Sequence, residues 1–290
     1  KKSGAFRKTK EFNMKSEQLK AVANKLVSEG KGLLAMDEST PTCNKRFAKL
    51  GIPQTVEMRR SYRELLVTTS GIEEFISGAI LYDETIHQSK KEGASFVQVL
   101  NQAGIIIGIK VDAGTKELAG HPGERATEGL DGLRERLEQY SEMGAQFAKW
   151  RAVISIGKEI PSHACLETNA HFLARYACLC QEVGLVPIVE AEVLMDGDHA
   201  LERCSEVTEN YLRIVFNQLY IQSAILEGLI LKTNMVLPGL TCPVQNIVED
   251  IADATVKCLM RAAPAAVPGI AFLSGGQPSK LASARLNAMN

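Results

Sequence analysis

Two lysines, Lys149 and Lys232, and two glutamates, Glu190 and Glu192, interrupt segments that are otherwise mostly apolar. A lysine amine is a nucleophile only when it is neutral, and burial near another cation lowers its pKa toward that state. Two neighbouring carboxyl groups do not both ionise easily, so one of them can keep a proton and act as general acid and then as base. Together with Asp37, these residues are candidates for covalent catalysis through a lysine.

Two plainer interpretations compete with this one. Each charged residue could be solvated where a strand meets a loop, although lysines rarely interrupt apolar segments without a partner or a task. Alternatively, the two glutamates could hold a divalent metal, but the five histidines show no ligand-type spacing, and the seven scattered cysteines contain no C-x-x-C pair. No dinucleotide or P-loop motif is present. We therefore expect no metal and no cofactor, and a reducing compartment.

Seven short apolar segments supply the strands that must position these residues. They cover residues 32–37, 77–83, 105–112, 146–153, 186–193, 227–234 and 269–276. Helical periodicity separates them, with apolar residues at helical spacing within residues 19–27, 133–140 and 170–178. Alternating strands and helices predict βαβ units in one parallel sheet.

A doubly wound open sheet and a closed barrel both fit this alternation. Charged or hydroxyl residues stand at the C-terminal ends of successive strands, and in a barrel these ends converge on one mouth. Strand alternation turns Glu190 and Glu192 to one face, and likewise Lys149 and Arg151. These patterns favour a (β/α) barrel. The segment LSGGQ after the last strand could let backbone N–H groups approach an anion, although a plain turn is an equal alternative.

The net charge and the lengths of the apolar runs limit the classes of partner that this protein can be expected to bind. The formal net charge of -1 supplies no field that would attract nucleic acid or an anionic membrane, so we expect a small-molecule partner. The longest apolar runs are too short to span a bilayer. Residues 1–14 form a basic tail that we expect to be disordered, either solvated or a targeting remnant, and residues 15–290 form a single barrel domain.

Several blocks of the sequence, from about residue 15 to the end, resemble the class I fructose-1,6-bisphosphate aldolases. They are GKGLLAMDEST, GIKVDAG, GLDGLRERL, FAKWRAV, LARYACLCQEVGLVPIVEAEVLMDGDH, EGLILKTNMV and AFLSGGQ, in the family's order. The resemblance implies a TIM barrel of the α/β class and a metal-independent, Schiff-base lyase of glycolysis. It also implies a cytoplasmic homotetramer, with a plastid location if the N-terminus is a targeting remnant. A cytoskeletal partner is a further implication.

The same resemblance assigns roles to individual residues. Lys232 resembles the Schiff-base lysine, Glu190 the general acid/base, and Glu192 its supporting carboxylate. Lys149 resembles the lysine that flanks the imine, and Asp37 the carboxylate that handles the C4 hydroxyl. Further positions resemble contacts to substrate and phosphate: Lys110, Arg151, Ser39, Lys45, Arg46, Ser274 and Gly275.

The sequence departs from the family pattern in two ways. Ala191 and Thr233 stand where the family usually has proline. In addition, the chain ends at LNAMN, just before the family's eighth strand, and we expect the native protein to continue into a tail that carries a phosphate-binding arginine. Two alternatives stay open: another Schiff-base barrel lyase such as a transaldolase, or a non-catalytic, aldolase-like binding protein.

Overall fold

The computed structural model describes residues 2–91 and 93–290. All seven predicted strands are present in one sheet with the order β1-β2-β3-β6-β7-β8-β9. Contacts divide the chain into two compact units: the first holds the residues up to 111, 132–149 and 179–187, and the second holds 112–131, 150–178 and 188–290. The predicted tail over residues 1–14 and single domain over 15–290 stay predictions. Residue 1 lies outside the described residues, and α1 (Lys2–Leu26) includes the rest of that tail.

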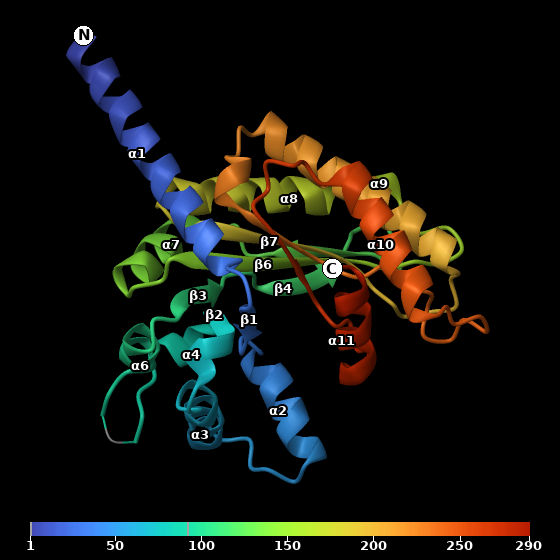
Figure 1. The fold of residues 1–290 in the computed structure, drawn as a ribbon, viewed down its shortest axis with the longest axis horizontal. Coiled ribbons are helices and arrows are strands. Elements are labelled where there is room, and N and C mark those ends of the chain that lie inside the picture. The colour runs from blue at the N-terminus through green and yellow to red at the C-terminus, as the bar shows by residue number, and fades with distance from the viewer. Residues whose placement is uncertain (1, 92) are drawn as a thin grey trace. The chain divides into compact units, whose positions relative to one another are not determined.

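Parallel strands organise the first unit. β1 (Gly32–Ala35) pairs with β2 (Ile76–Leu81), β2 with β3 (Ile106–Lys110), and β3 with the start of β6 (Phe147–Ile154). Figure 1 shows α4 beside β2 and α6 beside β3. The helices of this unit besides α1 are α2 (Thr40–Lys49), α3 (Val56–Val67), α4 (Ile72–Phe75), α5 (Asp83–Ile86), α6 (Phe96–Gln102) and α7 (Leu133–Glu142).

Local sequence explains where these helices begin and which face they bury. The Thr55 side chain accepts a hydrogen bond from the backbone N–H of Met58 and so caps α3. In α1, Leu19, Ala23 and Leu26 follow the helical period and are at most 1% exposed. The periodic segment predicted over residues 19–27 is therefore confirmed as the buried face of a helix.

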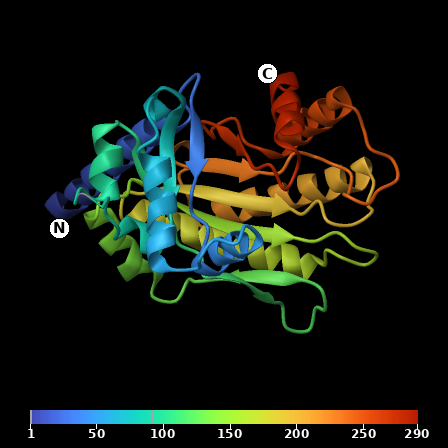
Figure 2. The ribbon, with the colours of Figure 1, turned by 90° about the horizontal axis from the view of Figure 1, so that it is seen from below.

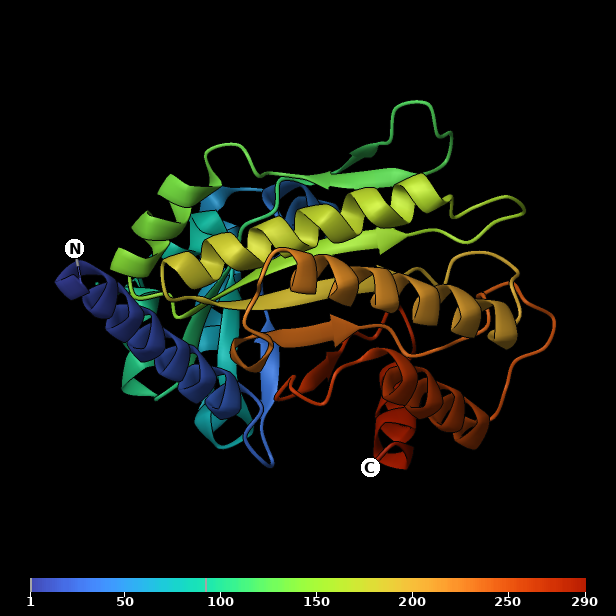
Figure 3. The same cartoon turned by 90° about the horizontal axis from the view of Figure 1, so that it is seen from above.

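The second unit continues the parallel pattern. The residues of β7 (Val186–Val193) from 188 onward pair with β8 (Ile230–Thr233), and β8 pairs with β9 (Ile270–Phe272). Figure 3 shows α10 beside both α9 and α11, in agreement with their contacts. The helices that remain to be given are α8 (His163–Glu182), α9 (Leu201–Ile221), the 3₁₀ helix η1 (Leu226–Gly228), α10 (Val248–Ala262) and α11 (Ser279–Ala288).

A two-stranded hairpin is absent from the sequence-based prediction. β4 (Gly114–Glu117) and β5 (Arg125–Glu128) form an antiparallel hairpin of their own (Figure 2). Their sequences, GTKE and RATE, are short and largely polar, so no apolar alternation marks them as strands.

Among the described residues, no helix combines the length and the apolar character needed to cross a membrane.

Close packing against glycine holds the first unit's strands together. The ring of Phe147 on β6 lies directly against Gly108 on β3, where an added Cβ would meet ring carbon Cε2 at 2.2 Å. A Cβ on Gly78 of β2 would lie 3.1 Å from the same ring and 2.6 Å from Leu26. Both glycines are thus required because no side chain fits between the strands and the ring.

We expect Gly108→Ala to lower the free energy of unfolding by about 2–3 kcal/mol, because the buried ring must move to admit the methyl group. Urea denaturation followed by circular dichroism measures the change. Gly32→Ala is the matched control, since Gly32 also lies in a strand of this sheet but has no atom within 4 Å of an added Cβ. Equal destabilisation by both substitutions would show that packing against Phe147 is not the constraint.

Candidate active site

Lys232 and Glu190 form a hydrogen-bonded ion pair on neighbouring strands of the second unit. They are direct register partners on β8 and β7, and Lys232 Nζ lies 2.8 Å from Glu190 Oε1. Their side chains are only 13% and 3% exposed, respectively. Parallel pairing at this register sets the two backbones side by side, so the long side chains meet. The pair joins a potential nucleophile to a potential proton acceptor.

A second ion pair lies next to the first. Arg151 on β6 donates to both carboxylate oxygens of Glu192, with Nε–Oε2 at 2.6 Å and Nη2–Oε1 at 2.9 Å. Its Nε is also 4.0 Å from Glu190 Oε1. Burial lowers the pKa of Arg151, but the hydrogen bond and charge of Glu192, with the charges of Glu190 and Asp112, raise it overall. Each glutamate therefore has a cationic partner.

Asp37 and Lys149 form the corresponding pair of the first unit. Asp37 follows β1, Lys149 lies on β6, and Nζ is 2.6 Å from Oδ2, with side-chain exposures of 5% for the lysine and 12% for the aspartate. Lys110, the last residue of β3, is the register partner of Lys149 and is partly exposed. Lys110 therefore ends β3, whereas Lys149 is the third residue of β6 and lies well before the end of its strand.

Glu38 is a structurally important residue that the sequence analysis did not single out. Its carboxylate accepts hydrogen bonds from Arg63 and Arg46 and from the Tyr62 hydroxyl, and its carbonyl accepts one from Arg63 at 2.9 Å. Arg63 is 2% exposed, so this contact neutralises a buried charge. The interaction fixes the segment that carries Asp37. The only sequence signal is an acid directly after Asp37.

The three predicted phosphate contacts of the first loop lie just before α2 or within its second half. Ser39 is the residue before the helix, and its hydroxyl is 3.0 Å from that of Thr42. Lys45 is exposed, as is Arg46, whose guanidinium contacts Glu38. Of these predicted residues, Arg46 is therefore already engaged by a carboxylate.

Asp112, one of the charged residues that the sequence places at a predicted strand end, also orders a neighbouring segment. Its Oδ2 accepts a hydrogen bond from the backbone N–H of Arg151 at 3.2 Å, and its Oδ1 accepts one from Gly114 at 3.1 Å. The carboxylate thereby holds β6 beside the segment that starts the hairpin. Its position two residues after Lys110 in the predicted strand over residues 105–112 is a usable signal, because residues two apart in a strand face the same side.

The predicted anion turn follows β9. Ser274 is exposed, and Gly275 and Gly276 have φ angles of 60° and 99°, a backbone conformation that favours glycine. Gln277 closes the turn by donating its backbone N–H to Ser274 O at 3.0 Å. The turn borders a small pocket, whose other lining residues are Val193, Met195, Cys204, Asn234, Met235, Leu237 and Leu273.

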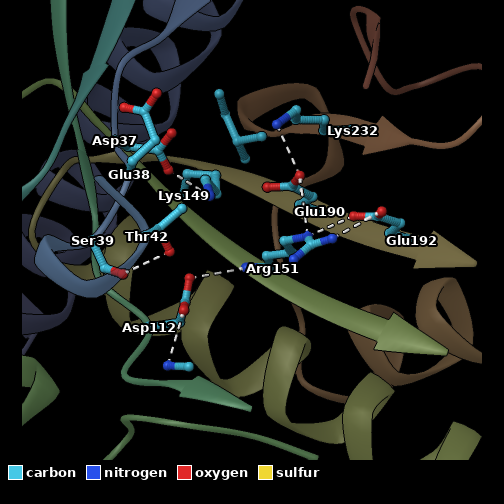
Figure 4. A network of polar contacts seen from close by, with 12 residues as sticks. Asp37, Glu38, Ser39, Thr42, Asp112, Lys149, Arg151, Glu190, Glu192 and Lys232 are labelled. Atoms are coloured by element: carbon cyan, nitrogen blue, oxygen red, sulfur yellow. Dashed lines mark hydrogen bonds and ion pairs between the residues drawn. The ribbon is translucent and has the colours of Figure 1, made fainter. Parts of the chain in front are cut away.

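Figure 4 shows how the site residues group. In the second unit the predicted residues Lys232, Glu190, Glu192 and Arg151 form one connected cluster. In the first unit the grouping is the Asp37–Lys149 pair. Across residues 2–91 and 93–290, no three His, Cys, Asp or Glu side chains gather in a way that could hold a metal ion.

Comparison with known proteins identifies what this arrangement resembles. The family model described as "Fructose-bisphosphate aldolase class-I" matches residues 18–290. A probable fructose-bisphosphate aldolase class 1 of Xanthomonas campestris is 57% identical over 277 residues, covering 96% of this chain and 83% of its own. The fructose-bisphosphate aldolase of Dictyostelium discoideum is 51% identical over 278 residues, covering 95% and 78%.

A solved structure supports the same conclusion. Plasmodium falciparum fructose-bisphosphate aldolase, crystallised with TRAP and a small-molecule inhibitor, superposes with a TM-score of 0.94 at 46% sequence identity, over 95% of this chain and 80% of that one. The predicted α/β barrel fold, with seven parallel strands among the described residues, is thereby confirmed. Family model, relatives and fold agree over nearly the whole sequence, and the chain belongs to the class I fructose-bisphosphate aldolases.

Proposed function

We propose that this chain cleaves fructose 1,6-bisphosphate into dihydroxyacetone phosphate and glyceraldehyde 3-phosphate, and catalyses the reverse condensation, through an imine on Lys232. Its membership of the class I aldolase family supports the reaction. The observation that carries the residue assignment is the hydrogen bond between Lys232 and Glu190. It joins an amine that must lose a proton to a carboxylate that can accept one.

Imine formation is the first proposed step. Lys232 Nζ transfers a proton to Glu190, 2.8 Å away, and the neutral amine attacks the C2 ketone of the substrate. Glu190 then returns a proton to the carbinolamine hydroxyl, which leaves as water. The resulting iminium is an electron sink. Glu192, held by Arg151, supports Glu190 by keeping a second fixed charge beside it.

Carbon–carbon cleavage is the second proposed step. Asp37 accepts the proton of the C4 hydroxyl, the C3–C4 bond breaks toward the iminium, and glyceraldehyde 3-phosphate leaves. Protonation of the enamine at C3 and hydrolysis of the imine release dihydroxyacetone phosphate and restore the amine. The Lys149 ammonium, 2.6 Å from Asp37, orients that carboxylate.

Phosphate contacts supply the binding energy that positions the reacting carbons. The proposed contacts follow from the family resemblance: Lys110, Arg151, Ser39, Lys45, Arg46, Ser274 and Gly275. Exposed Lys45 and Ser274 are open to a ligand as the structure stands. Arg46 must divide its charge between Glu38 and a phosphate, so we assign it a weaker contribution.

Assembly and location extend the proposal. We propose a cytoplasmic homotetramer, supported by family resemblance and by a 50% identical relative from Arabidopsis thaliana that is named cytosolic. The Plasmodium relative was crystallised with a second protein, TRAP. A cytoskeletal partner for this chain is likewise a proposal from the family resemblance.

We expect borohydride reduction in the presence of substrate to attach the triose to Lys232, since its amine is hydrogen-bonded to a proton acceptor on the neighbouring strand. Peptide mass mapping locates the adduct. Lys232→Met should abolish labelling and lower kcat at least about a thousandfold. Lys257→Met, which removes an exposed lysine of α10, is the control and should behave as wild type. An adduct on Lys149 or Lys110 would reassign the nucleophile.

Glu190→Gln tests the proton acceptor separately from the nucleophile. The amide has nearly the same shape and can still accept a hydrogen bond from Lys232, but it cannot carry a proton. We expect kcat to fall by about 10²–10⁴, the usual contribution of a general acid–base, while slow labelling of Lys232 persists. Steady-state rates and borohydride trapping measure the two effects. A kcat equal to that of wild type would remove Glu190 from the mechanism.

Metal independence is the third expectation for this site. A lysine imine already supplies the electron sink that a metal ion would otherwise provide. Incubation of the protein with EDTA, followed by gel filtration, should therefore leave its cleavage rate unchanged. A loss of activity that zinc restores would overturn the Schiff-base assignment.

A further inference from the structure

Arg285 on α11 is a buried cation with a neutral partner. It is 5% exposed, and its Nη1 donates to the side-chain oxygen of Gln277 at 2.7 Å. Its Nε is buried and finds no hydrogen-bond acceptor among the described residues. Burial lowers the pKa of Arg285, and no described charge offsets that effect. An arginine keeps its proton in proteins, so this positive charge has no counter-ion among the described residues.

The other buried arginines in the described part of the chain are paired differently. Arg59, at 6% exposure, forms an ion pair with Glu84, and Arg63, at 2%, forms one with Glu38. Buried charges are normally compensated in this way, because an unpaired one opposes folding. Arg285 is the exception, so its position needs a reason other than stability.

Gln277 links this charge to the turn after β9. Its backbone N–H closes the turn on Ser274 O at 3.0 Å, and its side chain, in a residue 7% exposed, accepts from Arg285 and lies 3.6 Å from Met235 Sδ. Within the described residues, the N–H groups of Gly275 and Gly276 donate to no protein acceptor. The turn therefore presents free backbone donors beside a buried positive charge.

We propose that Arg285 is a positioning residue for phosphate: through Gln277 it orders the turn of Ser274, Gly275 and Gly276, and the phosphate bound there is its missing counter-ion. The inference rests on the proposed function, in which this turn contacts a substrate phosphate. In a medium of low dielectric constant, a buried charge acts on an anion without direct contact. No charge of the described residues compensates Arg285, and an anion bound at the turn supplies that compensation.

Arg285→Met tests this idea, because methionine fills much of the same volume without the charge. Thermal unfolding is measured with and without inorganic phosphate. We expect the phosphate-free Tm of the variant to equal or exceed that of wild type, since an unpaired buried charge is removed. The phosphate-induced rise in Tm should fall to less than half. The KM for fructose 1,6-bisphosphate should rise about tenfold while kcat changes less than about threefold.

Gln277→Glu is the second variant and keeps the test decisive if methionine prevents folding. It gives Arg285 a carboxylate partner inside the protein, so the charge is neutralised while the hydrogen bond stays. We expect a higher phosphate-free Tm than that of wild type and a similar loss of phosphate stabilisation. Arg261→Met removes an arginine from α10 whose side chain is 64% exposed, and as the matched control it should leave both measurements unchanged.

A purely structural role for Arg285 predicts the opposite pattern. Arg285→Met would then lower the phosphate-free Tm and leave the phosphate-induced rise and the KM unchanged, which would overturn the proposal. Unchanged phosphate stabilisation of Gln277→Glu would also overturn it. Borohydride trapping separates this failure from failure of the proposed function: Lys232 of Arg285→Met should still be labelled at saturating substrate. An unlabelled wild-type Lys232 would reject the enzyme mechanism itself.

Discussion

The ion pair of Lys232 and Glu190 constrains how two neighbouring strands of the second unit pair. Neither charge is stable alone in so buried a place, and removing one member of such a pair typically costs about 3–5 kcal/mol. The register of β7 and β8 must therefore keep these two residues opposite each other. The same distance, 2.8 Å, also suits proton transfer. One contact thus serves folding and chemistry together.

The same electrostatic rule explains the polar groups around the proposed chemistry. Glu38 neutralises the buried Arg63 and thereby fixes the segment that begins with Asp37. Asp37 in turn has the ammonium of Lys149 as its partner. These ion pairs hold the loops in one conformation. Without them, fixing the side chains of the loops would cost a large amount of conformational entropy. Preorganised charges of this kind are what lets an enzyme act on a developing charge without moving its own groups.

Periodicity made most of the fold predictable. The seven strand segments are nearly continuous apolar runs, as expected of parallel strands that are covered on both faces, and each overlaps one strand of the sheet. The hairpin of β4 and β5 was not predicted, because its strands pair through backbone contacts and its polar residues show no hydrophobic pattern typical of a strand. The predicted proximity of Lys149 to Lys232 stays a prediction, and the described partner of each lysine is a carboxylate.

The sequence by itself determined the type of chemistry, since a lysine and paired glutamates at strand ends, in blocks with the order of one enzyme family, specify a Schiff-base lyase. It also determined the strand order along the chain, because hydrophobic period is a local property. Only the tertiary structure decided which acid pairs with which base, that Glu38 and Asp112 hold the loops, and that Arg285 is buried with a neutral partner. Those facts depend on register and packing between distant segments, where spacing along the chain carries no information about distance in space.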